Sequence, residues 1–335
     1  MKNKKMVLWI ALMVTEMLLL GCSKKAEAQE NPKTGSAKTV VYNSESDFET
    51  KPYFNSYDED DERNGTIIIT AYKGNAKIVN IPEKIKGEPV IIINENAFAN
   101  TNITSVTIPN TVTYIAKLAF KDCSKLTNIT IPDSVVGVGQ GAFSNCTSLT
   151  TVNIGKGFNG GGVNIFFRCI NLKTINIDSD NERFSSANGM LLSKDKTILY
   201  EYPSASGTFT IPDSVTEIGD LIFAENTRIT NITIPNSVTE IGLSAFRNCT
   251  SLTSINIPSS VTKIRDGVFA RCTSLTSVTF ENGSNIQDTD FGKYAFPEGG
   301  DDNYYDTHNT LKTAYSTGKA GTYTRQKNGS TWTKK

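Results

Sequence analysis

The sequence predicts a repeat solenoid that is mainly β with short helical turns, its parallel strands stacked in a curved array. One observation is a 23-residue period, because Pro212, Pro235 and Pro258 are spaced by that interval. A second is that large apolar residues keep the same period. The core residues expected at these positions are Phe120, Phe143, Phe166, Phe223, Phe246, Phe269, Cys123, Cys146, Cys169, Cys249 and Cys272. One unit cannot bury its own apolar face, so the units must stack to form a core.

The start of the chain has the pattern of a secretory signal. A few basic residues precede the apolar run from Met6 to Leu20, which is too short for a typical membrane span. The run ends in Leu-Leu-Gly-Cys, which resembles the bacterial lipobox, where the cysteine is acylated and becomes the new N-terminus. We expect residues 1–21 to be a signal peptide and Cys22 to carry lipid. An ordinary secretory signal with a chance cysteine is the alternative.

Residues 22–48 are expected to form a flexible tether. They are rich in Lys, Glu, Asn, Ser and Gly, with almost nothing to bury against the entropy of ordering. One acyl chain binds a membrane only marginally, but the resemblance to bacterial lipoproteins implies several chains and stable anchoring. The sequence therefore predicts a folded body held at a bacterial envelope surface.

Each repeat predicts a short strand, a proline that ends it and a compact turn. In one unit Leu126, Ile129 and Ile131 are expected to point inward, whereas Asn128 and Thr130 alternate outward. The proline that follows lacks an amide donor and marks the end of pairing. A Gly-x-x-Ala-Phe segment then begins about one helical turn that places a large ring in the core.

The ends and one interruption depart from the period. Residues 49–97 are expected to be an N-terminal cap and a first repeat lengthened by four residues, and residues 298–335 a C-terminal cap with a short helix and two strands. The solenoid proper is expected over 98–297. An insertion at about 178–207 contains two β-prone runs, Met190 to Leu192 and Thr197 to Tyr200, which predict a hairpin.

The repeat resembles the bacterial leucine-rich repeats of the BspA type. Ile-Pro, Ser-Val-Thr, Ala-Phe and Cys-x-x-Leu recur in fixed order, and the match covers roughly Gly65 to Phe296. The resemblance implies a leucine-rich-repeat solenoid on a bacterial surface, with a role in adhesion to host proteins or other cells. Fibronectin and fibrinogen are targets reported for members of the family, but a repeat scaffold does not itself specify a ligand.

Several patterns that suggest chemistry have simpler interpretations. Gly155 to Gly160 reads G-x-G-x-x-G, but too few residues separate it from the next strand at Leu172 for a crossover helix, which favours repeat variation. The cysteines share one repeat position, which favours core packing over disulfides or a metal site. His308 is the only histidine and lies beyond the repeats, and the acidic run from Asp58 to Glu62 lacks the pattern of a calcium loop. We expect no enzyme activity, no metal and no cofactor.

The remaining candidate is a binding surface. Outward positions of the strands form uncharged rows that include Asn128, Thr130, Thr151, Asn153, Thr174, Asn176, Asn231, Thr233, Ser254 and Asn256. Such rows can bind an extended chain or glycan, or can serve only to bond with one another along the sheet. Phe184, Tyr200 and Tyr202 near the insertion, and Tyr304 and Tyr305 near the end, are candidate anchors or cap residues.

We therefore expect a non-enzymatic, adhesin-like surface protein, lipid-anchored in the outer membrane or at the cell surface. The expected partners are an extracellular-matrix or host surface protein, or a glycan, and the membrane through lipid on Cys22. Lys plus Arg and Asp plus Glu are both 34, so nothing predicts nucleic-acid binding, which needs a clustered basic surface. A periplasm-facing structural lipoprotein scaffold is the alternative.

Overall fold

The computed structural model describes most of the chain as two units. Residues 42–335 form one compact unit, and of residues 1–41 only Val40 and Val41 are described. The described residues are 40–58, 60–162, 164–202, 206–297, 310–327, 329 and 331–335. The expected signal peptide, Cys22, Tyr304, Tyr305 and His308 lie outside them.

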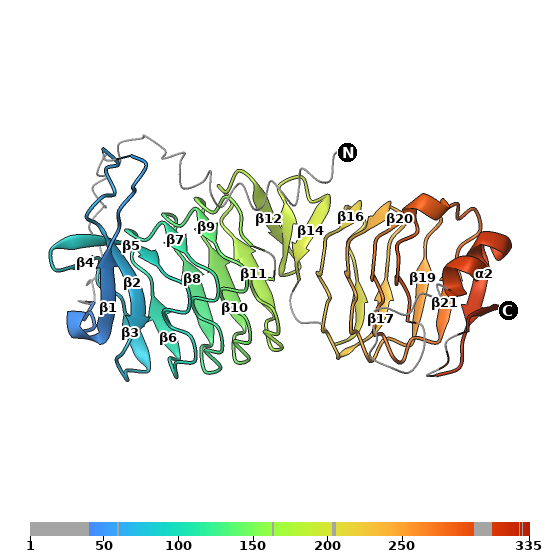
Figure 1. Ribbon diagram of the computed structural model, residues 1–335, viewed down its shortest axis with the longest axis horizontal. Coiled ribbons are helices and arrows are strands. Elements are labelled where there is room, and N and C mark those ends of the chain that lie inside the picture. Colours follow the sequence, from blue (N-terminus) through green and yellow to red (C-terminus); the bar gives the residue numbers. More distant parts are fainter. Residues whose placement is uncertain are drawn as a thin grey trace. The chain divides into compact units, whose positions relative to one another are not determined.

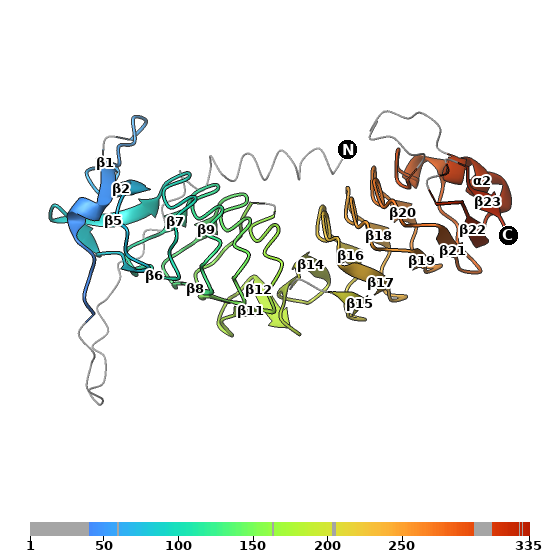
Figure 2. The ribbon, with the colours of Figure 1, turned by 90° about the horizontal axis from the view of Figure 1, so that it is seen from below.

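Residues 42–335 form a solenoid whose chain returns to the same three sides once per repeat, which confirms the expected fold class (Figures 1 and 2). The first side carries β3 (Ile78–Asn80), β6 (Ser105–Thr107), β8 (Asn128–Ile131), β10 (Thr151–Ile154), β11 (Thr174–Ile177), β15 (Gly207–Thr210), β17 (Ile229–Thr233), β19 (Ser254–Ile257) and β21 (Ser277–Phe280). The second side carries β5 (Glu88–Ile93), β7 (Tyr114–Ile115), β9 (Gly137–Val138), β16 (Glu217–Ile218), β18 (Glu240–Ile241) and β20 (Lys263–Ile264). Within each sheet these strands pair in parallel, so equivalent residues of successive repeats lie side by side.

The third side is a compact turn that carries the repeated phenylalanine. Two positions in each turn have a left-handed backbone, as in Leu118 (φ 57°) and Asp122 (φ 61°). This conformation costs about 1–2 kcal/mol for a residue with a side chain. Hydrogen bonds to the next turn offset that cost, because Leu118 N donates to Gln140 O at 3.1 Å and Asp122 N donates to Ser144 O at 2.9 Å. In the regular repeats, each turn therefore obtains hydrogen-bond acceptors from the turn that follows it.

The core is built as the period predicts. Leu126, Ile129 and Ile131 are buried, as are all the repeated phenylalanines and cysteines. The rings stack along the axis, for example Phe120 on Phe143 with centroids 5.1 Å apart and an interplanar angle of 5°. Each cysteine Sγ donates to the carbonyl of the phenylalanine one turn back, at 3.0 to 3.2 Å, and the five described cysteines are free thiols.

The folded body begins before the expected end of the tether. The sequence places residues 22–48 in the tether, but η1 (Glu45–Asp47) and β1 (Phe48–Pro52) belong to the N-terminal cap. Strand β1 pairs antiparallel with β2 (Ile67–Tyr72), and the Phe48 ring lies 5.5 Å from the Tyr72 ring. The prediction was wrong here because Phe48 is a lone apolar residue in a polar stretch, and its role is to cover the first ring of the stack. The four extra residues of the first repeat form a hairpin between β4 (Lys84–Ile85) and β5.

The insertion is a three-stranded antiparallel sheet of β12 (Phe184–Ala187), β13 (Met190–Ser193) and β14 (Ile198–Glu201). The hairpin of β13 and β14 is the predicted one, whereas β12 was not predicted. Strand β13 separates two cores, because Leu191 packs in the first core while Met190 and Leu192 pack in the second. Strand β14 then pairs with β16 and continues the second side.

The C-terminal cap closes the second core with α2 (Thr310–Gly318), β22 (Gly321–Thr324) and β23 (Thr333–Lys334), the helix and two strands that the sequence predicts. Strand β22 pairs antiparallel with β21, and a 3-10 turn, η2 (Asp288–Asp290), precedes the cap. Tyr315, Tyr323 and Trp332 are buried. None of the described helices has the length and apolar character needed to cross a bilayer.

Candidate functional site

The ten polar residues that the sequence predicts as a binding surface lie on the first side of the solenoid, and all are exposed or half-buried. We call them the polar strand face; they are Asn128, Thr130, Thr151, Asn153, Thr174, Asn176, Asn231, Thr233, Ser254 and Asn256. Strands β8, β10 and β11 pair in register, so these side chains lie in rows. Asn176 Nδ2 donates to Asn153 Oδ1 at 2.9 Å, and Asn256 Nδ2 donates to Glu281 Oε1 at 2.6 Å. The face is thus an ordered array of hydroxyl and amide groups, in one block on each side of the insertion.

The three aromatic residues near the insertion differ in accessibility. Tyr200 is 41% exposed. Phe184 is half-buried against the first core, with its ring 5.1 Å from that of Phe158. Tyr202 packs in the second core, with its ring 4.3 Å from that of Phe223. Tyr202 is partly buried and covers the Phe223 ring at the end of the second ring stack, which is the packing role that the sequence left open beside that of an anchor.

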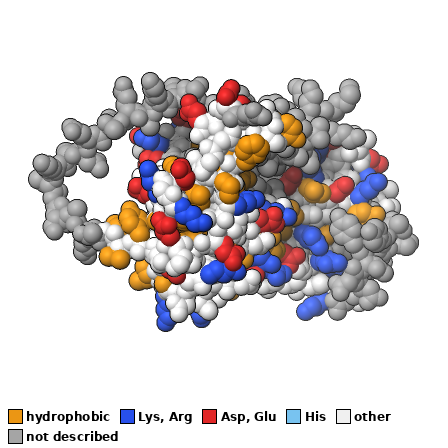
Figure 3. Space-filling model, turned by 60° about the vertical axis from the view of Figure 1, so that its left-hand side comes forward, with side chains coloured by type: hydrophobic (Ala, Val, Ile, Leu, Met, Phe, Trp, Pro, Cys, Tyr) orange, Lys and Arg blue, Asp and Glu red, His pale blue; other side chains and the backbone are white. Residues whose placement is uncertain are grey.

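The alternative chemical patterns have structural explanations. A Cβ at Gly157 would lie 1.9 Å from the carbonyl oxygen of Asp133 in the preceding turn, so this glycine permits close stacking of the two turns. The thiol of Cys146 and burial raise the pKa of Cys123, and the pKa of Cys146 is also raised, because the thiol of Cys169 and burial together outweigh the opposite effect of Cys123; both thiols therefore stay protonated. Among the described residues, no group of three or more His, Cys, Asp or Glu side chains could hold a metal ion. On the face shown in Figure 3, basic and acidic side chains are interspersed.

The insertion interrupts the third side of the solenoid. The turn of residues 164–169 is followed by β12 to β14, so the next turn of the same kind is formed by residues 221–226. Asn164 and Arg168 keep the left-handed backbone, with φ of 58° and 57°. Arg168 N nevertheless donates to no acceptor in the described part of the chain, whereas the equivalent Asn145 N donates to Phe167 O at 2.7 Å. The hydrogen-bond ladder between turns is therefore broken at this place.

On the opposite side of the break, two carbonyls of the turn of residues 221–226 lack hydrogen-bond donors among the described residues. In regular repeats the carbonyls of Ala142 and Ser144 accept amides from the preceding turn. The equivalent carbonyls, Ile222 O and Ala224 O, accept no hydrogen bond from any described residue. Two backbone acceptors on this wall are thus without the partners that every regular turn provides.

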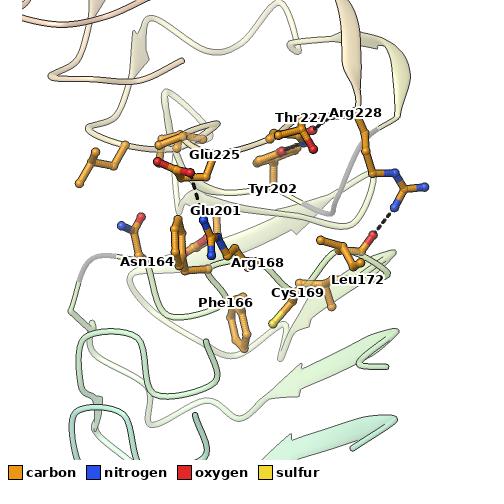
Figure 4. A pocket seen from close by; sticks show the side chains of 16 residues that line it. Asn164, Phe166, Arg168, Cys169, Leu172, Glu201, Tyr202, Glu225, Thr227 and Arg228 are labelled. Carbon is orange, nitrogen blue, oxygen red and sulfur yellow. Dashed lines mark hydrogen bonds and ion pairs between the residues drawn. The ribbon is translucent and has the colours of Figure 1, made fainter. Parts of the chain in front are cut away.

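Glu201, the last residue of β14, lies between the two turns (Figure 4). Its carboxylate accepts hydrogen bonds from the backbone amides of Ile165, at 2.9 Å, and Phe166. It replaces the carbonyl that a following turn would offer. Burial raises the pKa of Glu201 to about 7, although the two amides oppose this shift by favouring the charged form.

A pocket of about 70 Å³ lies at the break. Figure 4 shows the Glu201 side chain reaching into it between the turn of Phe166 and that of Glu225. Two arginines bridge the break: Arg168 pairs with Glu225 at 3.2 Å, and Arg228 donates to Ile170 O at 2.6 Å. Neither guanidinium bonds to Glu201, so within the described chain this carboxylate has no cationic partner.

The sequence reasoning did not find this pocket. The available signal was the interval of 34 residues between Asp178 and Pro212, which exceeds the 23-residue period and requires one turn to lack a neighbour. A second signal was Glu201 between Tyr200 and Tyr202, a carboxylate in an otherwise apolar strand. Neither signal by itself says which face of the insertion is open.

Comparison with solved structures shows similarity to bacterial leucine-rich-repeat proteins. A leucine-rich repeat protein from Eubacterium ventriosum is 25% identical, with a TM-score of 0.51 over 64% of this chain and 67% of that chain. The pneumococcal vaccine antigen PcpA is 20% identical, with a TM-score of 0.48 over 66% of this chain and 67% of that chain. A leucine-rich repeat protein of T. pallidum is 24% identical, with a TM-score of 0.33, over 77% of this chain and 91% of that chain. No protein with a curated description is a significant match.

The family assignment rests on the repeats themselves. A model of the BspA type leucine rich repeat region matches residues 71–188 and 199–302, in six copies. The residues between the two matched segments are those of the β13 strand and the turn after it, which is where the structure interrupts the solenoid. The matched family consists of repeat scaffolds, and no catalytic family is indicated. The chain therefore belongs to the BspA-type leucine-rich-repeat family.

Proposed function

We propose that this chain is a non-enzymatic, adhesin-like binding protein of the bacterial cell surface, anchored by lipid on Cys22. The observation that carries the proposal is the polar strand face, on which exposed hydroxyl and amide groups recur once per repeat in register. Membership of a repeat-scaffold family supports a role in binding. The lipobox-like Leu-Leu-Gly-Cys and the polar segment after it support display at a surface.

The chemistry of the face favours an extended polymer as the partner. Its rows lack the Trp, Tyr and Arg side chains that dominate compact protein hot spots. Neighbouring strands repeat at about 4.8 Å, so a polypeptide or glycan chain along the solenoid axis makes the same weak contact many times. Many weak contacts on one chain add to a useful affinity. The proposed partner is an extracellular-matrix or host surface protein, or a glycan.

The binding test uses residues 23–335 on an array of extracellular-matrix proteins and glycans. The variant Thr130→Arg with Asn153→Arg places two bulky charges in the first block of the polar strand face. Val136→Arg is the matched control, since Val136 is 43% exposed outside that face. We expect a saturable interaction that the double variant weakens at least tenfold and the control leaves unchanged. Equal binding by both variants would exclude this face.

Anchoring and display are tested in cells. Cys22→Ala is expected to release the protein from the membrane fraction, because no acyl chain can be attached. Protease added to intact cells should degrade the wild-type protein if it is displayed outward. Protection from the protease would favour the periplasm-facing structural scaffold.

A further inference from the structure

The pocket at the break between residues 164–169 and 221–226 has the features of a built site. In the regular repeats the next turn fills this position, and among the described residues the Glu201 side chain does so here. Its walls come from two turns held by the Arg168 to Glu225 ion pair and by the Arg228 to Ile170 hydrogen bond. The pocket is therefore a consequence of the insertion and does not overlap the polar strand face.

The two arginine side chains that line the pocket are already engaged with Glu225 and Ile170 O, whereas Glu201 carries a charge without such a partner among the described residues. Glu201 lacks a cationic partner in the described chain, whereas Glu225 is already neutralised by Arg168 and accepts Asn248 Nδ2 at 2.7 Å. Ile222 and Ala224 also line the pocket, and their backbone carbonyls accept no hydrogen bond from any described residue. Glu201 and the two carbonyls make three acceptor groups, and an ammonium group has three donors.

The size and apolar lining select among cations. A volume of about 70 Å³ holds roughly five to seven water-sized atoms at about 10–15 Å³ each. That matches the five heavy atoms of a lysine side chain, and Phe166, Leu172 and Ile222 supply apolar surface for its methylenes. Calcium would need six to eight oxygen ligands, which one unpaired carboxylate and two carbonyls do not provide.

We infer that the pocket between the turns of Phe166 and Phe223 binds an alkylammonium group, the lysine side chain of a polypeptide or a free primary amine. Glu201 is the counter-ion, the carbonyls of Ile222 and Ala224 accept the remaining ammonium protons, and the apolar lining holds the alkyl chain. This site is independent of the polar strand face, so either proposal can fail alone.

The test is titration of the full folded chain with Nα-acetyl-lysine-N-methylamide, followed by the amide NMR signals of Phe166 and Arg168. The Nε-acetylated derivative and the norleucine derivative are the matched probes without charge. We expect saturable shifts with the lysine derivative, at least tenfold weaker shifts with the two neutral probes, and tighter binding at pH 8 than at pH 6. Binding should be tighter at pH 8 because Glu201, whose pKa is raised to about 7, is then charged. The other charged groups that line the pocket are Arg168, Arg228 and Glu225.

Three variants separate the site from general effects. Glu201→Gln should weaken binding at least tenfold and remove its pH dependence. Glu182→Gln, at an exposed carboxylate that does not line the pocket, should change affinity less than threefold. Ala224→Phe fills the pocket while Glu201 remains, and it should also abolish binding, which keeps the inference testable if Glu201→Gln does not fold. Equal shifts with norleucine, full affinity in Ala224→Phe, or the same shifts with calcium alone would overturn the inference. Butylamine distinguishes the sources: affinity equal to that of the lysine derivative assigns a free amine, and weaker affinity assigns a polypeptide lysine.

Discussion

Strand β13 is expected to divide the solenoid into two halves that unfold separately, and a matched pair of substitutions tests this. Phe143 is at the centre of the ring stack in the first core, with centroids 5.1 and 5.7 Å from Phe120 and Phe166. Phe246 has the same place in the second core, at 4.9 and 5.0 Å from its neighbours. Both rings are fully buried. Phe143→Ala and Phe246→Ala therefore remove equivalent groups from different cores.

The magnitude follows from burial and stacking. Replacing a buried phenylalanine by alanine costs about 3–5 kcal/mol, and the loss of two stacked pairs places these sites at the upper end, about 4–5 kcal/mol. With a urea dependence of about 2 kcal/mol per M for each half, this lowers the urea midpoint of that half by roughly 2 M. Val136→Ala, at an exposed site, should change stability by less than about 0.5 kcal/mol.

Tryptophan fluorescence assigns the transition to a half. In residues 23–335 the only tryptophan is Trp332, which lies in the second core. Phe246→Ala should lower the urea midpoint of Trp332 fluorescence by about 2 M. Phe143→Ala should leave that midpoint in place and instead lower the midpoint for unfolding of the first core, which circular dichroism detects as a separate transition. An equal shift of Trp332 fluorescence in both variants would show that β13 transmits stability between the cores and would refute this reasoning.

Three further predictions follow from single residues. Burial raises the pKa of Glu201 from 4.5 to about 7, so the folded state binds the proton more tightly than the unfolded state. The contribution of Glu201 to the free energy of unfolding therefore falls by about 3 kcal/mol as pH rises from about 4.5 to 7. The difference in unfolding free energy between wild type and Glu201→Gln should show this dependence on pH, and a pH-independent difference would contradict it. Gly157→Ala should lower the melting temperature by several degrees, because its Cβ would meet Asp133 O, while Val136→Ala, at an exposed site, is the control; equal melting temperatures would mean that the turns do not stack this closely. The five repeat cysteines should resist a thiol reagent in the native protein and react only in denaturant, since all five are buried and the Cys146 thiol together with burial raises the pKa of Cys123; fast labelling of native protein would be inconsistent with the buried thiols.

Much of the fold was predictable because a solenoid is built from contacts between adjacent repeats. The alternation of Leu126, Ile129 and Ile131 with polar residues fixes which side chains point inward, and each repeat confirms the next. The C-terminal helix and strands and the hairpin of β13 and β14 were also predicted, since each has a local pattern of its own. Strand β12 was missed because Phe184–Ala187 is too short and too polar to show an alternation.

The sequence by itself determined the period, the inward-facing residues and the family, because these depend on residues close together in the chain. Only the tertiary structure decided what happens where the period fails. Glu201 lies 36 residues from Ile165, and their hydrogen bond depends on how three inserted strands pack between two cores. The packing of Tyr202 on Phe223 and the inclusion of Phe48 in the cap are likewise decided by the ends of the two ring stacks, which must be covered. A repeat pattern predicts regular neighbours, whereas a missing neighbour leaves unpaired backbone groups and apolar surface whose partners come from distant parts of the chain.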